Sequence, residues 1–185
     1  DYAEKGGHLL AMTMAFSRDE WGSGIFEKSP VGMTDFFGMH VVEMEPVFDG
    51  QTDAPVRIGE LTIRSHFWQE TLESEGAEVL GTFCGTYRDG WPVLTEHPYG
   101  KGSALYLGTA PAPEDAPALL RWLLERCGVS MPPVEMTYGL SVVTRLSETE
   151  RYVFVFNSLP REQVCRLTRS LEADYGIGEL RGQTL

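Results

Sequence analysis

Cys84 is the residue whose type and position most directly suggest catalysis, because it follows a strand-like stretch that ends at residue 83. A cysteine at a strand end can act as a nucleophile when a histidine such as His97 accepts its proton and a helix N-terminus lowers its pKa. Residues 86–92, however, have the composition of a turn and not of a helix. The segment therefore favours a structural cysteine, and an amidotransferase-like hydrolase that uses Cys84 stays an alternative.

Histidine spacing and glycine spacing give no evidence for a metal ion or a cofactor. His8, His40, His66 and His97 are scattered, without the H-x-x-x-H or H-E-x-x-H spacing that brings two imidazoles to one metal. The Gly-Lys-Gly segment at 100–102 lies between two strand-like stretches and matches neither the Walker pattern nor the dinucleotide fingerprint. We expect a hairpin turn there, no metal site and no cofactor.

Carboxylates next to an aromatic ring are a third candidate, because paired acids carry out glycoside hydrolysis. Asp19 and Glu20 stand beside Trp21, but 27 acidic residues in 185 make such a cluster expected by chance, so a solvated acidic loop is favoured. Aromatic residues near loops also suggest an interface, where Trp and Tyr are enriched. The candidates for a subunit interface or a sugar-proximal position are Asp19, Glu20, Trp21, Phe26, Trp68 and Trp91.

Composition limits the class of protein that could carry these residues. Fifteen basic and 27 acidic side chains give a net charge of −12, which argues against a nucleic-acid partner. No apolar run approaches the ~20 residues of a membrane-spanning helix, and the first residues lack the features of a signal peptide. Cys84, Cys127 and Cys165 are far apart in the sequence, as expected for reduced thiols. We therefore expect a cytoplasmic protein that contacts no membrane.

The first residues predict the end of a helix followed by a buried strand. Residues 2–5 favour a helix, and Gly6 and Gly7 supply the left-handed residue that ends one. Residues 8–15 form a nearly continuous apolar run, which is typical of a strand covered on both faces in a parallel sheet. We expect the second half of a βαβ unit whose opening elements are either absent or on another part of the gene product. The alternative is a short, frayed N-terminal helix.

The rest of the first two thirds of the chain predicts mainly strands. Alternating apolar residues indicate strands, whereas residues 67–72 are ambiguous between helix and strand and residues 33–37 indicate a short helix. Residues 17–30 and 46–55 have loop composition, and residues 99–102 form a glycine-rich turn. The predicted strands cover residues 39–45, 56–63, 77–83, 92–96 and 103–108.

The clearest helix covers residues 114–127, where apolar residues recur on one stripe and Gly128 provides the C-cap. The Met-Pro-Pro segment at 131–133 then breaks the chain and is the predicted domain boundary. Beyond it, residues 140–145, 152–156 and 164–167 predict short strands without a helical pattern. A small antiparallel β module is therefore expected after the boundary.

Three stretches follow one another in a specific order: GAEVLGTF at 76–83, GWPVLT at 90–95 and YGKGSALYLGT at 99–109. They resemble the run GAEVLATY … G-x-P-A-V-T … YGKGRAYYVGT of glycoside hydrolase family 42 β-galactosidases. Further resemblance to that family spans nearly the whole chain. It lies at residues 2–10, which resemble Y-V-E-A-G-G-x-L-V, at 32–41, which resemble L-x-D-L-L-G-V-x-V, and at 151–157, which resemble a strand of the small terminal β domain.

This resemblance implies a two-domain organisation. Residues 1–130 would form an α/β trimerisation domain, a partial flavodoxin-like (class I amidotransferase-like) layered sheet with helices and with its N-terminal elements missing. Residues 134–185 would form a small C-terminal antiparallel β domain. The family's two catalytic glutamates lie in a preceding (β/α)₈ barrel of about 250 residues, which does not fit in this chain. No carboxylate here would therefore have a catalytic role.

The function implied by the resemblance is a non-catalytic assembly segment of a retaining β-galactosidase that hydrolyses terminal β-galactosides in carbohydrate metabolism. We expect self-association, as trimers in that family, a barrel on the same gene product as partner, and no activity from this chain alone. Residues 17–20 (SRDE) match the family's SG-x-V-D-E loop only in part. The alternatives are the hydrolase that uses Cys84 and a carbohydrate-binding module that uses loop tryptophans.

Overall fold

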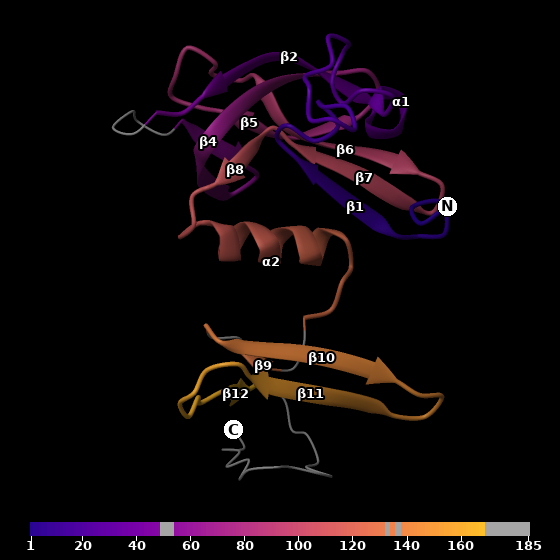
Figure 1. Cartoon of the computed structure of the whole chain (residues 1–185), viewed down its shortest axis with the longest axis vertical. Coiled ribbons are helices and arrows are strands. Elements are labelled where there is room, and N and C mark those ends of the chain that lie inside the picture. Colours follow the sequence, from indigo (N-terminus) through magenta and orange to yellow (C-terminus); the bar gives the residue numbers. More distant parts are fainter. Residues whose placement is uncertain (49–53, 132–133, 136–137, 169–185) are drawn as a thin grey trace. The chain divides into compact units, whose positions relative to one another are not determined.

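The computed structural model describes residues 1–48, 54–131, 134–135 and 138–168 (Figure 1). The chain divides into two compact units, Asp1–Cys127 and Gly128–Leu185. The described residues are mostly β, with a mixed sheet in the first unit, short antiparallel pairs in the second, and two helices. Neither of these two helices is long and apolar enough to cross a membrane.

The first unit contains an eight-stranded sheet in the order β1-β7-β6-β5-β3-β4-β2, with β8 paired to β4. β1 is parallel to β7, and the other pairs described in this sheet are antiparallel. The sheet is thus less parallel than predicted, because tight turns join strands that must run in opposite directions. The strands are β1 (His8–Met12), β2 (Met39–Pro46), β3 (Pro55–Ile58), β4 (Leu61–Ser74), β5 (Glu78–Phe83), β6 (Pro92–Tyr99), β7 (Gly102–Leu107) and β8 (Thr109–Pro111).

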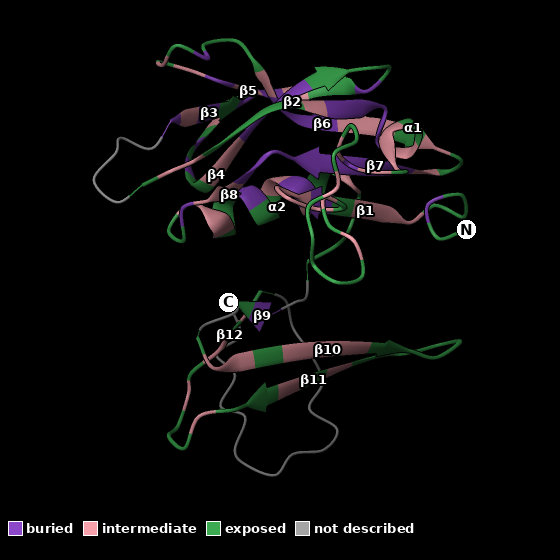
Figure 2. Ribbon diagram, turned by 45° about the horizontal axis from the view of Figure 1, so that its top comes forward, coloured by how far each residue is buried: buried purple, intermediate pink, exposed green. Residues whose placement is uncertain are grey.

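The two helices cover opposite faces of β7, which is buried along most of its length (Figure 2). Leu105 and Leu107 belong to the apolar cluster that contains Leu119 and Leu123 of helix α2 (Ala116–Arg126). Tyr106 lies in the other cluster, with Phe37 of helix α1 (Thr34–Phe37). Because successive strand residues point to opposite faces, this alternation makes β7 the centre of a layered core.

β3 and β4 form a hairpin where the sequence predicts one interrupted strand over residues 56–63. Ile58 pairs with Leu61, and Gly59, at a positive φ of 55°, makes the two-residue turn between them. β4 then continues for 14 residues to Ser74, which assigns the ambiguous stretch 67–72 to a strand. A register shift occurs between His66 and Gln69 in its pairing with β8. Pairing with three neighbouring strands therefore overrides the weak local pattern.

The N-terminal residues form one turn with the hydrogen bonds of a helix end. Gly6 N–H donates to the Ala3 carbonyl and Gly7 N–H donates to the Tyr2 carbonyl, both at 3.0 Å, and Gly6 has a φ of 105°. This pair of bonds is the Schellman pattern, so the predicted capping is present although residues 2–6 form a turn and no helix. The following β1 is only partly buried, with Leu10 41% exposed, because it pairs with β7 on one edge.

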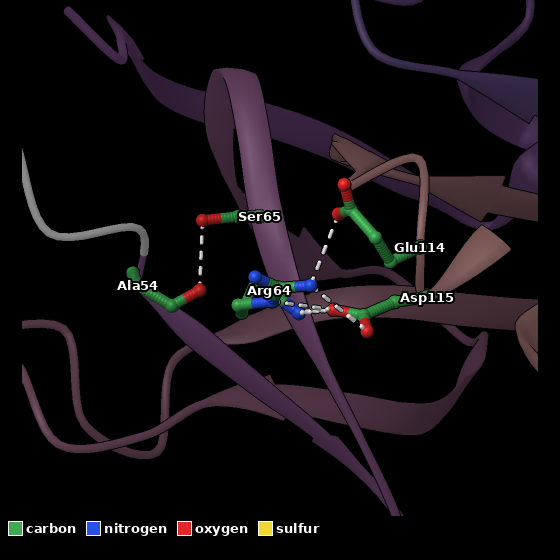
Figure 3. A network of polar contacts seen from close by, with 5 residues as sticks. All are labelled: Ala54, Arg64, Ser65, Glu114 and Asp115. Carbon is green, nitrogen blue, oxygen red and sulfur yellow. Dashed lines mark hydrogen bonds and ion pairs between the residues drawn. The ribbon is translucent and has the colours of Figure 1, made fainter. Parts of the chain in front are cut away.

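A polar contact ties α2 to β4 and replaces a side-chain cap at the helix start (Figure 3). The Arg64 backbone N–H and Nε each donate to Asp115 Oδ2 at 2.9 Å, and Arg64 Nη2 donates to Glu114 Oε2 at 3.1 Å. Next to it, the Ser65 hydroxyl donates to the Ala54 carbonyl at 2.8 Å. The two acidic residues that suit the helix N-terminus thus also fix its position on the sheet.

The second unit contains the antiparallel pair β10 (Leu140–Leu146) and β11 (Arg151–Asn157). A shorter antiparallel pair joins β9 (Val134–Glu135) to β12 (Arg166–Leu167). The predicted strands at 140–145 and 152–156 are confirmed, and only the end of the predicted strand at 164–167 is a strand. Residues 169–185 of the predicted β domain lie outside the described residues.

We predict that Asp115→Asn destabilises the protein at neutral pH, because a neutral amide cannot keep the charge-assisted bonds to Arg64. Those hydrogen bonds hold the pKa of Asp115 below its ordinary value. Its stabilising contribution is therefore present above the ordinary pKa and lost as pH falls through the lowered one. Urea unfolding should separate variant and wild type at pH 7 and bring them together in strong acid. Glu114→Gln is the control with a smaller effect, and an equal gap at both pH values would contradict the prediction.

We predict that Gly102→Ala destabilises the protein by about 1–3 kcal/mol, the usual effect of forcing a group into packed space. A Cβ at residue 102 would overlap the Gly7 carbonyl, which accepts the Ser103 N–H at 3.3 Å where the N-terminal turn packs on the β6–β7 hairpin. Gly24→Ala is the matched control, because no atom lies within 4 Å of its added Cβ. Equal melting temperatures for the two variants would disprove this packing constraint.

Candidate interaction surface

Cys84 directly follows β5 and lacks the surroundings of a nucleophile. Its Sγ donates to the Pro55 carbonyl at 3.4 Å, and residues 85–90 form bends and turns instead of a helix. His97 donates from Nδ1 to the Phe36 carbonyl at 3.0 Å. Among the hydrogen bonds of the described residues, none joins Cys84 to a histidine. This geometry does not support the hydrolase alternative.

The histidines lie at separate places in the first unit. His8 Nδ1 contacts the Ser103 hydroxyl at 2.9 Å, and His40 Nδ1 lies 2.9 Å from Glu75 Oε1. His66 is exposed on β4. Over the described ranges, no three His, Cys, Asp or Glu side chains are arranged to hold a metal ion.

Residues 16–28, called the aromatic loop from here on, contain three exposed large apolar side chains, and Trp21 and Phe26 are more exposed than Phe16. Asp19 Oδ1 accepts the backbone N–H of Trp21 at 3.0 Å and of Ser23 at 2.7 Å. Arg18 Nη1 donates to the Gly22 carbonyl at 2.8 Å, which closes the tip from the other side. Aspartate favours such turns because its short side chain can accept backbone N–H groups two residues on. The tip is therefore an ordered turn with Trp21 81% exposed.

The base of the aromatic loop is bonded to the chain on both sides. Ile25 N–H donates to the Ser17 carbonyl at 3.1 Å, and Val31 N–H donates to the Phe16 carbonyl at 2.9 Å. Val41 N–H of β2 donates to the Ser29 carbonyl at 2.8 Å, which attaches the end of this segment to the sheet. Phe26, between these anchors, is fully exposed. Its exposure therefore occurs within a hydrogen-bonded segment.

Glu70 is a buried carboxylate beneath the aromatic loop, with a side chain that is 1% exposed. Its Oε1 accepts the Met14 N–H at 2.8 Å and its Oε2 accepts the Tyr106 hydroxyl at 2.9 Å. Burial raises the pKa of Glu70, and these two hydrogen bonds act in the opposite direction. Burial together with the adjacent carboxylate raises the pKa of Tyr106. A cavity of about 280 Å³, lined by Glu70, Met44 and Ile25 among others, separates the loop from the sheet.

Arg88 is also buried, and it supports an aromatic pair. Its Nη2 lies 3.0 Å from Glu45 Oε2 and its Nη1 donates to Gln69 Oε1 at 3.1 Å. The guanidinium lies 5.1 Å from the ring centre of Tyr87. The Tyr87 hydroxyl donates to Glu45 Oε2 at 2.7 Å, and this bond is the main reason why the pKa of Tyr87 is raised. The Tyr87 and Trp91 rings meet edge to face with centres 6.3 Å apart. Glu45 and the buried Arg88 therefore fix the position of Tyr87 in this Tyr87–Trp91 pair.

The aromatic loop and the Tyr87–Trp91 pair lie on opposite faces of the β2–β4 ribbon. Met44 pairs with Glu70, and Glu45 pairs with Gln69, across these two strands. Paired residues share a face, and successive residues alternate. Met44 and Glu70 line the cavity under the loop, whereas Glu45 and Gln69 contact Arg88. The β2–β4 ribbon thus has the aromatic loop on one face and the Tyr87–Trp91 pair on the other.

The structure brings four of the six candidate residues into one loop, Asp19, Glu20, Trp21 and Phe26, and places the other two elsewhere. Trp91 is 40% exposed in the Tyr87–Trp91 pair. Trp68 is half-buried on β4, with its carbonyl accepting the Thr109 hydroxyl at 2.6 Å.

Sequence reasoning missed the burial of Glu70 and Arg88. A signal existed for Glu70, because it stands in a stretch, residues 67–72, that is otherwise rich in apolar and aromatic residues. Arg88 offered none, since it lies in a segment with turn composition where charged residues are ordinarily exposed.

Comparison with known proteins identifies the family. The family described as "Beta-galactosidase trimerisation domain" matches residues 1–130, so the chain belongs to this family. It is 29% identical over 162 residues to β-galactosidase LacZ of Heyndrickxia coagulans, covering 88% of this chain and 24% of that protein. It is 31% identical over 129 residues to a β-galactosidase of Arthrobacter sp., covering 69% and 18% respectively. The chain thus spans a quarter or less of these relatives.

Solved structures show the same fold. The crystal structure of a cold-adapted β-galactosidase from Rahnella sp. R3 superposes with a TM-score of 0.72 at 19% identity, over 91% of this chain and 26% of that one. The resemblance inferred from the motifs at 76–83, 90–95 and 99–109 is confirmed by the family match. These relatives do not favour the hydrolase or the carbohydrate-binding module.

We predict that Glu70→Gln changes the pH dependence of stability. Because the pKa of Glu70 is raised above its ordinary value of 4.5, the folded protein binds this proton more tightly than the unfolded chain. The wild type therefore loses stability as pH rises through the interval between the two values, and the variant lacks this loss. Urea unfolding from pH 4 to pH 8 measures it, with Glu60→Gln, at an exposed turn residue, as the control. Parallel curves for wild type and Glu70→Gln would contradict the assignment.

Proposed function

We propose that this chain is the assembly segment of a retaining β-galactosidase and that it holds copies of the enzyme together as a trimer without carrying out hydrolysis. The observation that carries the proposal is the match of residues 1–130 to the β-galactosidase trimerisation domain. The chain covers only 24% and 18% of the length of two β-galactosidases that it resembles, which supports a segment of a longer enzyme. Hydrolysis of terminal β-galactosides would then belong to a barrel on the same gene product.

The finer organisation is part of this proposal. Residues 1–130 would form a trimerisation domain of partial flavodoxin-like, class I amidotransferase-like type, and residues 134–185 a small C-terminal β domain. The parallel β1–β7 pair and the helices on both faces of β7 support the first assignment. A cytoplasmic location, without nucleic-acid or membrane partners, is supported by the net charge of −12 and the three free cysteines.

The proposed contact residues are the candidates Asp19, Glu20, Trp21, Phe26, Trp68 and Trp91. Trp21 and Phe26 carry most of the argument, because large exposed aromatic side chains are the usual energetic centres of interfaces. Burying one aromatic side chain removes ~150 Å² or more from water, worth ~4 kcal/mol before the costs of association. The hydrogen bonds of Asp19 order the loop before association, so little entropy is lost there on binding.

We predict that the double variant Trp21→Ala/Phe26→Ala of the natural polypeptide dissociates at concentrations where the wild type is a trimer. Losing two interface anchors raises the dissociation constant by ~100-fold or more, since each contributes more than about 1–2 kcal/mol. Analytical ultracentrifugation over a concentration series measures this shift.

The matched control is Tyr138→Ala, which removes an aromatic side chain that is 87% exposed but lies in the second unit. It should leave the sedimentation profile unchanged. A double variant that sediments as the wild type does would remove these two residues from the interface. A wild type that is monomeric throughout would contradict the proposed function itself.

A further inference from the structure

We infer that the aromatic loop is a lid over the cavity beneath it, and that ionisation of the buried Glu70 favours the open position of this lid. The cavity, of about 280 Å³, has the loop on one side and residues of β2 and β4 on the other. All of these elements belong to Asp1–Cys127, so the lid is a property of unit 1 and does not require that copies of the chain associate.

The cavity separates the aromatic loop from the sheet where apolar side chains would otherwise pack together. Ile25 of the loop and Met44 of β2 both line this space, with Glu70 of β4. A volume of about 280 Å³ can admit several water molecules, each of which occupies ~30 Å³ in the liquid. The position of the loop therefore depends strongly on the hydrogen bonds at its two ends, Met14 to Glu70 and Val41 to Ser29.

The segment that leads into the loop is strained in the closed position. Met14 and Phe16 have φ angles of 65° and 55°, a left-handed conformation that is unfavourable for any residue with a Cβ. Glu70 Oε1 accepts the Met14 N–H at 2.8 Å, and the Ser17 hydroxyl donates to the Met14 carbonyl at 2.7 Å. These two bonds hold Met14 in its strained conformation. Opening the lid would relieve the strain, so Met14 and Phe16 are the hinge residues.

Glu70 also opposes the closed position when it is ionised. Its side chain is 1% exposed, and burial raises its pKa although Met14 and Tyr106 donate hydrogen bonds to it. An open lid would admit water to the carboxylate and remove most of this burial, so the closed lid binds the Glu70 proton more tightly than the open one. A rise in pH through the raised pKa of Glu70 therefore favours opening.

The other charged groups around Glu70 do not produce this effect. Arg18 and Glu27 line the same cavity from the loop, but both are exposed and their opposite charges act on Glu70 in opposite directions. The Tyr106 hydroxyl faces Glu70 from β7, and because its own pKa is raised it stays uncharged at acid and neutral pH. Met44, which pairs with Glu70 across β2, has no charge.

The first test is hydrogen exchange of the natural polypeptide from pH 4 to pH 8, followed by mass spectrometry in peptides that cover residues 14–31. The protection, which is the exchange rate of an unstructured peptide divided by the measured rate at the same pH, reports lid opening. In the wild type it should fall as pH rises, by at most ~10-fold per pH unit, because one proton is linked to opening. Glu70→Gln cannot ionise and should keep constant protection. Glu27→Gln, at an exposed carboxyl on the same cavity, is the matched control and should follow the wild type.

The second test examines the hinge with a pair of variants. Met14→Gly removes the Cβ, whereas Met14→Ala keeps it, so the difference between them isolates the backbone strain. Met14→Gly should show ~2- to 5-fold higher protection than Met14→Ala, since relief of strain outweighs the added freedom of glycine in the open lid. Both variants keep Glu70, so this comparison and the wild-type pH profile decide the question if circular dichroism shows Glu70→Gln to be unfolded.

The outcomes separate the lid from the proposed function. Wild-type protection that does not change with pH, or that falls equally in Glu70→Gln, overturns the role of Glu70. Equal protection in the two Met14 variants overturns the strained hinge. Sedimentation of the same wild-type samples reports the trimer independently, so a monomer with pH-dependent protection contradicts the proposed function and supports the lid.

Discussion

The buried carboxyl group of Glu70 joins three segments that are far apart in the sequence. It belongs to β4, accepts the Tyr106 hydroxyl of β7, and accepts the Met14 N–H just after β1. A carboxyl group that is 1% exposed is unfavourable unless its oxygens have hydrogen-bond partners, so these contacts constrain where β1 ends. The aromatic loop begins two residues after Met14, and its position follows from the same constraint.

The β2–β4 ribbon has a different set of contacts on each of its two faces. Because neighbouring residues of a strand point to opposite faces, Glu70 and Gln69 contact different layers although they are adjacent in sequence. Glu70 supports the side that carries the aromatic loop, and Gln69 with Glu45 supports Arg88 on the other side.

Local patterns predicted the elements whose stability is local. The helix expected over 114–127 is present as Ala116–Arg126, because its apolar stripe and acidic first residues depend only on neighbours within a few turns. The turn at 99–102 is likewise present, with Tyr99 paired to Gly102. The hairpin at Gly59 was missed, since one glycine in an alternating run is compatible with both a continuous strand and a turn. β1 is less buried than its apolar sequence suggested, because burial depends on what pairs with its free edge.

The sequence by itself determined the family, through the ordered motifs at 76–83, 90–95 and 99–109. It also indicated the aromatic residues of the loop. These are properties of short segments and can be recognised without knowing their neighbours. Only the tertiary structure decided that Glu70 and Arg88 are buried, that Cys84 bonds to the Pro55 carbonyl, and that the aromatic residues divide between two faces. The reason is physical: strand register sets which face a side chain takes, and register comes from long-range pairing between strands.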